Sequence, residues 1–366
     1  MTYERDNIAA MAGYSYGEQP EVDGVIKLNT NENPHPPSPA VQQALNATDA
    51  SALRIYPSAT AASLRQAIAD HHGVDVAQVV CTHGGDEALR LAITTFVGEG
   101  ETFGMAEPSY SLYPVLAAVQ NAKVQRIELQ ADWALPADTA QRLNAAAARL
   151  TCIVNPHAPS GVLASTESML ALAQALGGVL LIDEAYADFI APDEGYSSAE
   201  LVNQLDNLLI LRTFSKGYSL AGLRLGYLLG SANLIEPILT KTRDSYNIDA
   251  ISQLLGEAAL GDQAYAQQTW QQVRSDRQAL LAGLAQLGFN APPSHSNFLL
   301  VAVPDGRAET AQHLYETLKA RNIYVRYFAE PRLADRLRIS VGTAEQNQAL
   351  IAALQDCLSA AAGAAS

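Results

Sequence analysis

The sequence contains few cysteines, and their positions exclude two kinds of stabilising site. Its 366 residues include 3 cysteines, Cys81, Cys152 and Cys357, which lie far apart. This spacing matches neither the close pairs that ligate zinc nor the dense set that crosslinks a small secreted domain. We therefore expect reduced, mostly buried thiols, and we expect no metal site.

The sequence also lacks long uncharged apolar runs. No segment reaches the roughly 18 consecutive apolar residues that a membrane-spanning helix requires. Residues 1–20 contain no basic stretch followed by an apolar stretch, which a secretory signal would have. The expectation is a cytoplasmic protein without membrane contact.

Positive charge is scarce as well. Lysine and arginine total 23 against 38 acidic residues, so the formal net charge is -15. Nucleic acids and anionic membranes attract basic surfaces, and this balance therefore argues against both as partners. A small anionic ligand stays compatible with it, because a few local arginines can hold one. The hydrophobic share of 48% is ample for a sizeable core in more than one compact unit.

Short apolar runs alternate with helical patterns through the middle of the chain. This alternation predicts an α/β domain with a mainly parallel sheet flanked by helices. Ligands bind beyond the carboxyl ends of the strands in such sheets, so the residues that follow each run are candidates for a site. The predicted strands are Val79–Cys81, Leu150–Val154, Val179–Ile182, Leu208–Leu211 and Leu225–Leu229, with helices at Asp86–Phe96 and Thr166–Ala175.

We predict three parts along the chain. Residues 1–50 form an N-terminal segment, whose proline-rich stretch Asn29–Pro39 can be neither a helix nor a central strand. By composition alone this stretch would be a surface linker. Residues 51–247 form a large domain, and residues 248–366 form a smaller α+β domain that begins with a long helical stretch. The strands expected in the smaller domain are Phe298–Val303, Ile323–Arg326 and Leu337–Val341.

Three reactive side chains follow two of the predicted strands. Lys216 comes after Leu208–Leu211, and an amine there would be partly desolvated, which lowers its pKa and makes it a nucleophile toward a carbonyl. Most lysines after strands are simply solvated. Asp183 ends another apolar run, and it could cap a helix or pair with a protonated ring nitrogen. Tyr186 could then donate a hydrogen bond to an oxygen of the same ring.

A glycine-rich helix start offers a place for a phosphate. Gly85 and Asp86 begin a predicted helix, whose free N–H groups can bind an anion. Arg224 and Ser215 could add further contacts. Tyr110 could stack on an aromatic ring, or it could be a core tyrosine. Together these residues supply an amine, a carboxylate, a phenol and an anion cradle, which are the groups that pyridoxal phosphate requires.

A set of short motifs, taken together, resembles the fold-type I, class II pyridoxal-phosphate-dependent aminotransferases. Within that family the set is most similar to the histidinol-phosphate aminotransferase group. The motifs follow the family order and cover nearly the whole chain. They are Leu28–Pro34, Tyr56–Pro57, Gly84–Ala88, Asp183–Tyr186, Arg212–Lys216, Ala221–Tyr227, Ser296–Phe298 and Leu337–Thr343.

The resemblance implies a seven-stranded type of large domain, pyridoxal 5′-phosphate as cofactor, and a role for each motif residue. Lys216 would bind the cofactor aldehyde covalently and act as the catalytic base and acid. Asp183 would face the pyridine nitrogen, and Tyr186 the ring oxygen O3′. Tyr110 would stack on the ring. The cofactor phosphate would lie among Gly85, Asp86, Glu87, Ser215 and Arg224.

The resemblance also implies substrate contacts and a partner subunit. Arg338, helped by Arg326, would hold an anionic group of the substrate. The proline-rich N-terminal stretch becomes a wall of the active site rather than a linker. Tyr56 would reach the phosphate in the neighbouring active site, which implies a homodimer. The residues expected to line the substrate side are Asn29, Asn31 and Tyr14.

One position departs from the family pattern. Many relatives have Asn-Pro-Thr-Gly after a strand, and that asparagine bonds O3′, whereas this chain has Ala158 at the corresponding position. Tyr186 then holds O3′ alone, or together with Asn155 or a water. Losing one hydrogen bond is worth roughly 1 kcal/mol net, which would retune the cofactor rather than abolish its binding.

The implied reaction converts L-histidinol phosphate and 2-oxoglutarate to imidazole acetol phosphate and glutamate, a step of histidine biosynthesis. An aromatic amino acid aminotransferase would share the same framework. A threonine-phosphate decarboxylase would carry out a different chemistry on it. A cofactor-binding regulator without catalysis is disfavoured, because such proteins usually add a basic DNA-binding module and none is evident.

Overall fold

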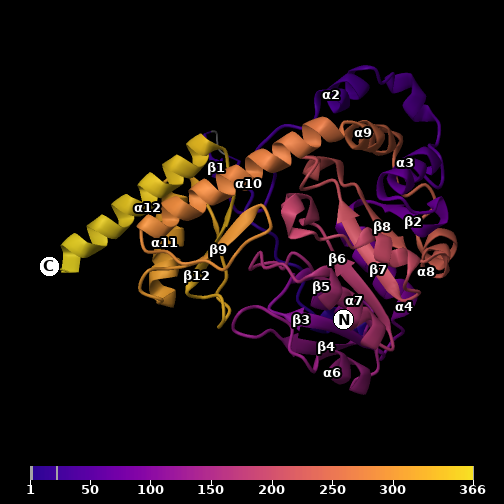
Figure 1. The fold of residues 1–366 in the computed structure, drawn as a ribbon, viewed down its shortest axis with the longest axis horizontal. Coiled ribbons are helices and arrows are strands. Elements are labelled where there is room, and N and C mark those ends of the chain that lie inside the picture. The colour runs from indigo at the N-terminus through magenta and orange to yellow at the C-terminus, as the bar shows by residue number, and fades with distance from the viewer. Residues whose placement is uncertain (1–2, 22–23, 366) are drawn as a thin grey trace.

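The computed structural model describes residues 3–21 and 24–365, and its ribbon has two lobes (Figure 1). The larger lobe contains a seven-stranded sheet, and the smaller one contains strands β9 (Phe298–Ala302) and β12 (Arg336–Ser340). Helix α10 (Gln263–Gln286) runs from the larger lobe along the smaller one. The predicted α/β architecture is confirmed, whereas the predicted domain bounds stay a prediction.

The large sheet is mainly parallel, as predicted. Its strand order is β2-β8-β7-β6-β5-β3-β4, and the five strands from β7 to β4 run parallel to one another. Except in the edge strand β4, the residues of these strands are mostly apolar and buried because helices cover both faces of the sheet. The strands are β2 (Val79–Thr82), β3 (Thr102–Glu107), β4 (Lys123–Glu128), β5 (Ala148–Val154), β6 (Val179–Asp183), β7 (Leu208–Thr213) and β8 (Gly226–Gly230).

Strand β8 corrects the expectation that Leu225–Leu229 is a parallel strand. It pairs antiparallel with both β7 and β2. The connection from β7 to β8 contains only the short 3-10 helix Ala221–Leu223, and a parallel return needs a longer crossover, usually an α-helix. Because β8 runs in the opposite direction, it begins at the edge of the sheet where the parallel strands end.

Two further segments differ from the sequence prediction. Strands β3 and β4 were not predicted; charged and polar residues interrupt β4, which is the edge strand. The predicted strand Ile323–Arg326 is split into β10 (Ile323–Tyr324) and β11 (Arg326–Tyr327). These two pieces pair with different partners, β10 with β1 (Ile26–Lys27) and β11 with β12, so one run of residues belongs to two sheets.

Alternate residues of each strand build two cores, one on either face of the large sheet. On β6, Leu180 and Ile182 belong to one cluster and Leu181 belongs to the other. Helices α3 (Ala62–His72), α6 (Thr139–Ala145), α7 (Thr166–Ala175) and α9 (Ala250–Gly261) contribute to the first cluster. Helices α4 (Gly84–Phe96), α5 (Leu112–Val119) and α8 (Ala232–Pro237) contribute to the second.

The smaller lobe has its own core and includes part of the N-terminal segment. Its antiparallel sheet has the order β11-β12-β9, and β1 pairs parallel with β10. Leu28, 2% exposed, belongs to the apolar cluster of this lobe. Its remaining helices are α11 (Ala308–Ala320) and α12 (Ala344–Ala365); α1 (Asp6–Ala10) and α2 (Pro39–Asn46) belong to the N-terminal segment.

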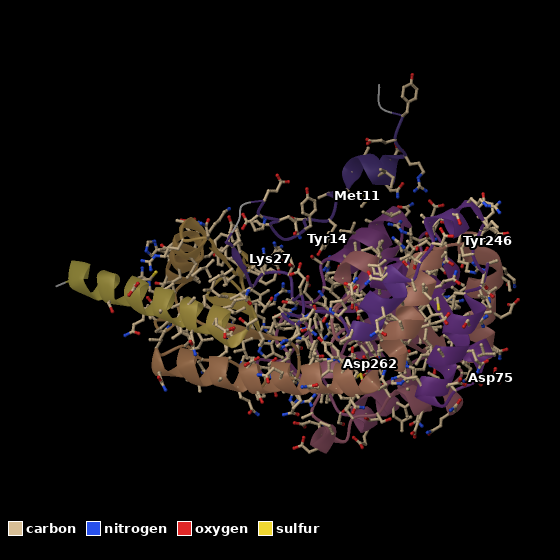
Figure 2. The ribbon with its side chains drawn as sticks, turned by 90° about the horizontal axis from the view of Figure 1, so that it is seen from above. Met11, Tyr14, Lys27, Asp75, Tyr246 and Asp262 are labelled. Atoms are coloured by element: carbon tan, nitrogen blue, oxygen red, sulfur yellow. The ribbon has the colours of Figure 1, made fainter. Side chains whose placement is uncertain are left out.

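The N-terminal segment follows one side of the molecule (Figure 2). Met11, Tyr14 and Lys27 mark its course, and Tyr246 lies at the opposite end of the larger lobe. All three cysteines are free and buried, as expected. Among residues 3–21 and 24–365, no helix combines the length and apolarity needed to cross a membrane, and no cluster of side chains could hold a metal ion.

Two adjacent glycines before β6 give a stability prediction. A Cβ at Gly178 would lie 2.2 Å from the Ala148 carbonyl oxygen, whereas a Cβ at Gly177 would have only an ordinary contact with Asn144 at 3.6 Å. We expect Gly178→Ala to lower the free energy of unfolding by about 1–3 kcal/mol, because the backbone of β5 cannot move aside easily. We expect Gly177→Ala to change it by less than about 0.5 kcal/mol.

Urea denaturation of both variants measures this difference. Equal unfolding free energies for the two variants would show that β5 and β6 are less closely packed than described.

Candidate active site

A cavity of about 730 Å³ lies at the carboxyl edge of the large sheet, where the two lobes and the N-terminal segment meet. It contains groups from all three parts of the chain. Most of the residues predicted from the sequence therefore come together in one place. The predicted residues that line it are Tyr14, Asn29, Asn31, Gly85, Asp86, Tyr110, Asp183, Tyr186, Ser215, Lys216, Arg224, Arg326 and Arg338.

Strand direction explains why these side chains meet. Asp183 is the last residue of β6, and Ser215 and Lys216 follow β7. Parallel neighbours end at the same edge, so these residues become neighbours. Arg224 comes just before β8 and reaches the same edge only because β8 is antiparallel.

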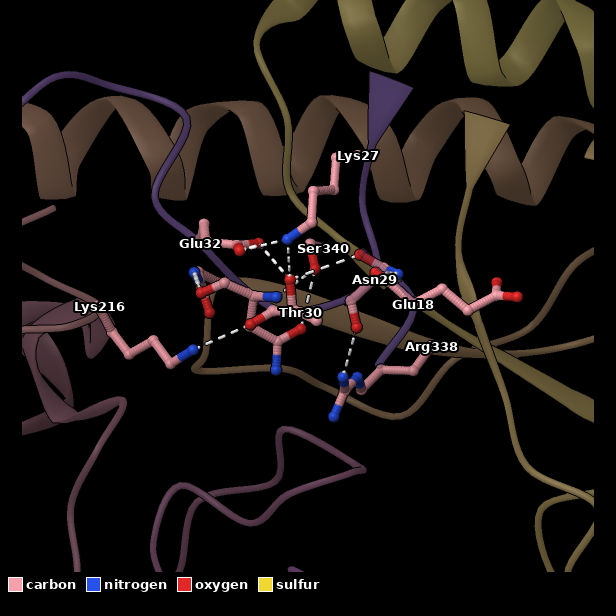
Figure 3. Close-up of polar contacts among 10 residues, drawn as sticks. Glu18, Lys27, Asn29, Thr30, Glu32, Lys216, Arg338 and Ser340 are labelled. Carbon is pink, nitrogen blue, oxygen red and sulfur yellow. Dashed lines mark hydrogen bonds and ion pairs between the residues drawn. The ribbon is translucent and has the colours of Figure 1, made fainter. Parts of the chain in front are cut away.

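Lys216 points toward the N-terminal segment (Figure 3). Its Nζ donates a hydrogen bond to the Thr30 carbonyl at 2.9 Å. Burial in the cavity disfavours the ammonium and lowers the lysine pKa to about 8, although the Glu32 carboxylate opposes this shift. At pH 7 this pKa leaves about a tenth of the Lys216 side chains neutral, far more than for a solvated lysine, which favours a nucleophilic amine.

Asp183 is buried, with 5% of its surface exposed, and both of its oxygens accept hydrogen bonds. Tyr113 Oη donates to Oδ2 at 2.8 Å, and the Ala185 backbone N–H donates to Oδ1 at 3.1 Å. Desolvation nevertheless raises the aspartate pKa to about 6. A cationic group in the cavity would restore its negative charge, so Asp183 is suited to face a protonated ring nitrogen.

Tyr113 is a residue that the sequence reasoning missed. It is fully buried in α5, and burial keeps the pKa of its phenol well above the usual value, so it stays a donor. Its ring meets that of Tyr110 edge to face at 5.6 Å, and Tyr110 in turn meets Tyr14 at 5.8 Å. A sequence signal existed: Tyr113 lies only three residues after Tyr110, and its N–H donates to the Tyr110 carbonyl at 3.2 Å in the turn that leads into α5.

Arg224 contacts the start of α4, where the sequence predicts a phosphate-binding site. Gly84 has a φ of 77°, and a Cβ there would lie 2.7 Å from Arg224 Nη2, so both the backbone conformation and the space require glycine. Arg224 Nη1 donates to Ser215 Oγ at 3.3 Å, and Nη2 donates to the Asp86 carboxylate at 3.3 Å. Free N–H groups and a guanidinium thus face the same point.

The opposite end of the cavity also suits an anion. Arg338 Nη2 donates to the Asn29 carbonyl at 2.8 Å, but its Nε is buried and has no partner within residues 3–21 and 24–365. An unpartnered buried guanidinium N–H is costly, and a carboxylate or phosphate would satisfy it. Phe328 lies 5.5 Å from the Arg338 guanidinium and 5.2 Å from that of Arg326, so one ring contacts both arginines.

Segment Asn29–Glu32 forms a wall of this cavity, and the interpretation of the proline-rich stretch as a surface linker is wrong. Asn29 and Asn31 are each 1% exposed. Lys27 bonds both Thr30 and Glu32, and Thr30 bonds Glu32, in a network beside Lys216 (Figure 3). Sequence reasoning did not single out Lys27, Thr30 or Glu32, although Thr30 and Glu32 lie within its first motif.

Two predicted site residues do not line the cavity. The Glu87 carboxylate accepts from the backbone N–H of His83, before its own helix, and from Asn247 Nδ2 at 3.0 Å. Glu87 thus caps α4, and its assignment to cofactor binding is not supported by this placement. Tyr56 is 78% exposed and stacks on Tyr246 with ring centroids 4.6 Å apart.

The segment after β5 contains Asn155, which the sequence left open as a second donor to the ring oxygen. Asn155 Nδ2 donates to the Ala164 carbonyl at 2.9 Å, and its Oδ1 accepts from the Ala164 N–H at 2.9 Å. Both ends of the Asn155 amide are thus bonded to Ala164 in the loop that follows β5. Ala158 lines the cavity and packs in one cluster with Tyr186.

Comparison with known proteins gives a consistent family. The sequence model described as "Aminotransferase class I and II" matches residues 23–354. The chain is 43% identical to histidinol-phosphate aminotransferase 1 of Trichormus variabilis, over 97% of this chain and 99% of that protein. It is 41% identical to histidinol-phosphate aminotransferase of Synechocystis sp., over 95% and 96% of the two chains.

Solved structures agree with this family. The crystal structure of histidinol-phosphate aminotransferase from Sinorhizobium meliloti in complex with pyridoxal-5′-phosphate is similar, with a TM-score of 0.83 and 26% identity over 90% of this chain and 89% of that one. L-threonine-O-3-phosphate decarboxylase from Porphyromonas gingivalis shares the fold, with a TM-score of 0.78 and 21% identity over 91% and 99%.

The Tyr113 contact gives a prediction for the protein without ligands. Tyr113→Phe removes one donor to Asp183 and keeps the ring, so we expect the Asp183 pKa to rise above about 6. Infrared difference titration of the carboxylate band in unliganded protein measures this pKa. Tyr110→Phe is the matched control, because its hydroxyl donates to Asp86 instead. An unchanged Asp183 pKa in Tyr113→Phe would contradict the role given to this bond.

Proposed function

The chain belongs to the class I and II aminotransferases, and we propose that within this family it transfers the amino group of L-histidinol phosphate to 2-oxoglutarate. The products are imidazole acetol phosphate and glutamate. The cofactor in this proposal is pyridoxal 5′-phosphate. The observation that carries the proposal is the presence of Lys216, Asp183 and the unpartnered Arg338 Nε in one cavity.

The donor set of the cavity fits the cofactor. Lys216 offers an amine for its aldehyde, Asp183 a carboxylate for its ring nitrogen, and Tyr186 a phenol for its ring oxygen. Tyr110, which also lines the cavity, would stack on the ring. The phosphate would be held by the N–H groups of Gly85 and Asp86, by the Ser215 hydroxyl and by the Arg224 guanidinium.

Asp183 and Lys216 have different roles in the proposed reaction. Pyridoxal phosphate, when bound, supplies an aldehyde that accepts amines and a ring that withdraws electrons. Asp183 keeps the ring nitrogen protonated, because its own charge is stabilised by that cation. Lys216, whose pKa is about 8 in the unliganded protein, takes a proton from the substrate carbon and returns it.

The positively charged end of the cavity, formed by Arg338 and Arg326, supports a phosphorylated amine as substrate. Arg338 can form a two-pronged contact with a carboxylate or a phosphate, and Arg326 adds a second positive charge beside it. The same guanidinium can hold the distal carboxylate of 2-oxoglutarate in the second half of the reaction. Asn29 and Tyr14 line this side of the cavity. The relatives from Trichormus variabilis and Synechocystis sp. support the choice of histidinol phosphate, because both are named histidinol-phosphate aminotransferase.

An aromatic amino acid aminotransferase is the second candidate, because Phe328 and the Tyr14–Tyr110 pair give the cavity aromatic walls. The similarity to threonine-phosphate decarboxylase concerns the fold alone. Phenylalanine offers Arg338 only a singly charged carboxylate, whereas threonine phosphate offers a phosphate as histidinol phosphate does, so the release of carbon dioxide separates that chemistry from amino transfer.

We also propose a homodimer in which Tyr56 reaches the neighbouring subunit's phosphate site. Tyr56 is exposed, and so are five other large apolar side chains, one of which, Tyr246, stacks on it, which is unusual for a surface that faces water. These are Leu45, Leu53, Ile55, Tyr246 and Leu254. A cytoplasmic location completes the proposal, supported by three buried thiols without a disulfide.

A substrate panel tests the reaction. We expect turnover with L-histidinol phosphate and 2-oxoglutarate to exceed turnover with phenylalanine by about 100-fold or more in kcat/KM, because the singly charged carboxylate of phenylalanine compensates the Arg338 and Arg326 charges less than a doubly charged phosphate does, a difference of about 3 kcal/mol. Lys216→Ala should lose turnover with every donor. Carbon dioxide release from threonine phosphate, or a preference for phenylalanine, would overturn the proposed substrate.

Mixing two variants tests the shared site. Lys216→Ala and Tyr56→Ala homodimers should each be impaired, and their mixture should regain activity. In a mixed dimer, one site combines an intact Lys216 with an intact Tyr56 from the other subunit. Sedimentation should show a dimer of 39.0 kDa chains. A mixture with only the averaged activity of its components would mean that Tyr56 acts within its own chain.

A further inference from the structure

Asn31 lines the cavity but has almost no surface left for a substrate. It is 1% exposed, and its backbone and side chain bond three other residues. Its N–H donates to Ser340 Oγ, and its Oδ1 accepts from that hydroxyl, both at 2.9 Å. Its carbonyl accepts from Asn297 Nδ2 at 2.9 Å. Its Nδ2 donates to Tyr186 Oη at 3.0 Å.

The backbone at Asn31 is also special. Its φ is 58°, in the left-handed region, which asparagine tolerates better than most residues do. The two preceding carbonyls accept from Arg338 and Lys216, so the whole turn is held in place (Figure 3). The Asn31 amide is therefore fixed relative to Tyr186.

This amide decides where the Tyr186 hydrogen points. Since the Tyr186 oxygen accepts from Asn31, its own O–H must be donated elsewhere. Within residues 3–21 and 24–365 no acceptor is found for it, and Tyr186 lines the cavity. The hydrogen bond that Tyr186 accepts from Asn31 also makes the phenol a better donor, because it stabilises negative charge on the phenol oxygen.

The family's second donor to the ring oxygen is missing from this chain. Ala158 has no polar side-chain atom, and the Asn155 amide is bonded to Ala164. Of the two positions that the family resemblance assigns to that oxygen, 158 and 186, only Tyr186 has a side-chain donor. Whatever orients Tyr186 has more influence here than in a chain with two donors.

We propose that Asn31 is a positioning residue that acts through Tyr186, directing its hydroxyl to the ring oxygen of the cofactor in place of the donor that Ala158 cannot supply. This inference rests on the proposed pyridoxal phosphate. It replaces the expectation that Asn31 binds substrate. The experiment is a spectrophotometric pH titration of the bound cofactor's visible absorption, with the cofactor dissociation constant as a second readout.

Asn31→Gly is the informative variant, because glycine accepts the left-handed backbone and removes only the amide. A donor to the ring oxygen stabilises its anionic form, so losing the donor raises the pKa of the bound chromophore. We expect the titration midpoint to rise by about half a pH unit to one unit. The cofactor dissociation constant should rise about three- to ten-fold.

Two further variants test the route of the effect. In a Tyr186→Phe background, Asn31→Gly should cause no additional shift, because the residue through which it acts is gone. Adding Ala158→Asn to Asn31→Gly should move the midpoint back toward that of the wild type by restoring a second donor. Other titratable groups that face Tyr186, namely Arg338, Asp183, Tyr14 and Lys216, stay the same throughout.

Asn322→Gly is the matched control. Asn322 is exposed, has a φ of 60° and does not line the cavity, so it reports the general effect of this substitution at a left-handed position. Its midpoint should equal that of the wild type. An unshifted midpoint in Asn31→Gly, or an equal shift in the Tyr186→Phe background, would overturn the inference. A wild-type protein that binds no cofactor would instead refute the proposed function.

Discussion

Two consecutive carbonyls of the N-terminal segment join the halves of the cavity. The Asn29 carbonyl accepts from Arg338, which comes from β12 of the smaller lobe, and the Thr30 carbonyl accepts from Lys216, which follows β7 of the larger lobe. The Arg338 guanidinium and the Lys216 amine thus bond consecutive residues of this segment. Asn31 continues this arrangement by bonding Tyr186 and Ser340. A segment with no helix and hardly any strand therefore sets the distance across the site, and its hydrogen bonds keep it in place.

Burial shifts the pKa values of Lys216 and Asp183, two ionisable groups that line the cavity. It lowers the pKa of Lys216 to about 8 and raises that of Asp183 to about 6, so both are shifted toward their neutral forms in the unliganded protein. Each shift is a cost that a complementary ligand removes. A protonated ring nitrogen would stabilise the Asp183 carboxylate, whose geometry Tyr113 already fixes. The unpartnered Arg338 Nε lies at the other end of the same cavity. An electron-withdrawing cationic ring and an anionic substrate therefore fit the site better together than water does.

Particular residues show how far the sequence could predict this arrangement. The apolar runs located β5, β6 and β7 within two residues at each end, because buried parallel strands have continuous apolar residues. They did not reveal the direction of β8, which depends on the short connection from β7. Helix α7 was predicted with its observed bounds, whereas edge strand β4 was missed because its exposed residues are polar. For the site, the sequence identified thirteen residues that line the cavity, ten of them within the motifs, yet Glu87 caps its own helix and Tyr113 was overlooked.

The sequence by itself determined the kinds of chemical group and their order along the chain: a lysine after one apolar run, an aspartate after another, glycines before a helix, and arginines near the end. Those features are local, since each depends on neighbours a few residues away. Only the tertiary structure decided which polar atoms were left without partners and which were already bonded. The Asn155 amide is used by Ala164, the Asn31 amide by Tyr186, and Arg338 Nε by none of the described residues. The Asn31–Tyr186 bond joins residues 155 positions apart, and the Asn155–Ala164 bond, which joins residues 9 positions apart, depends on how the intervening loop folds, so the sequence patterns showed neither.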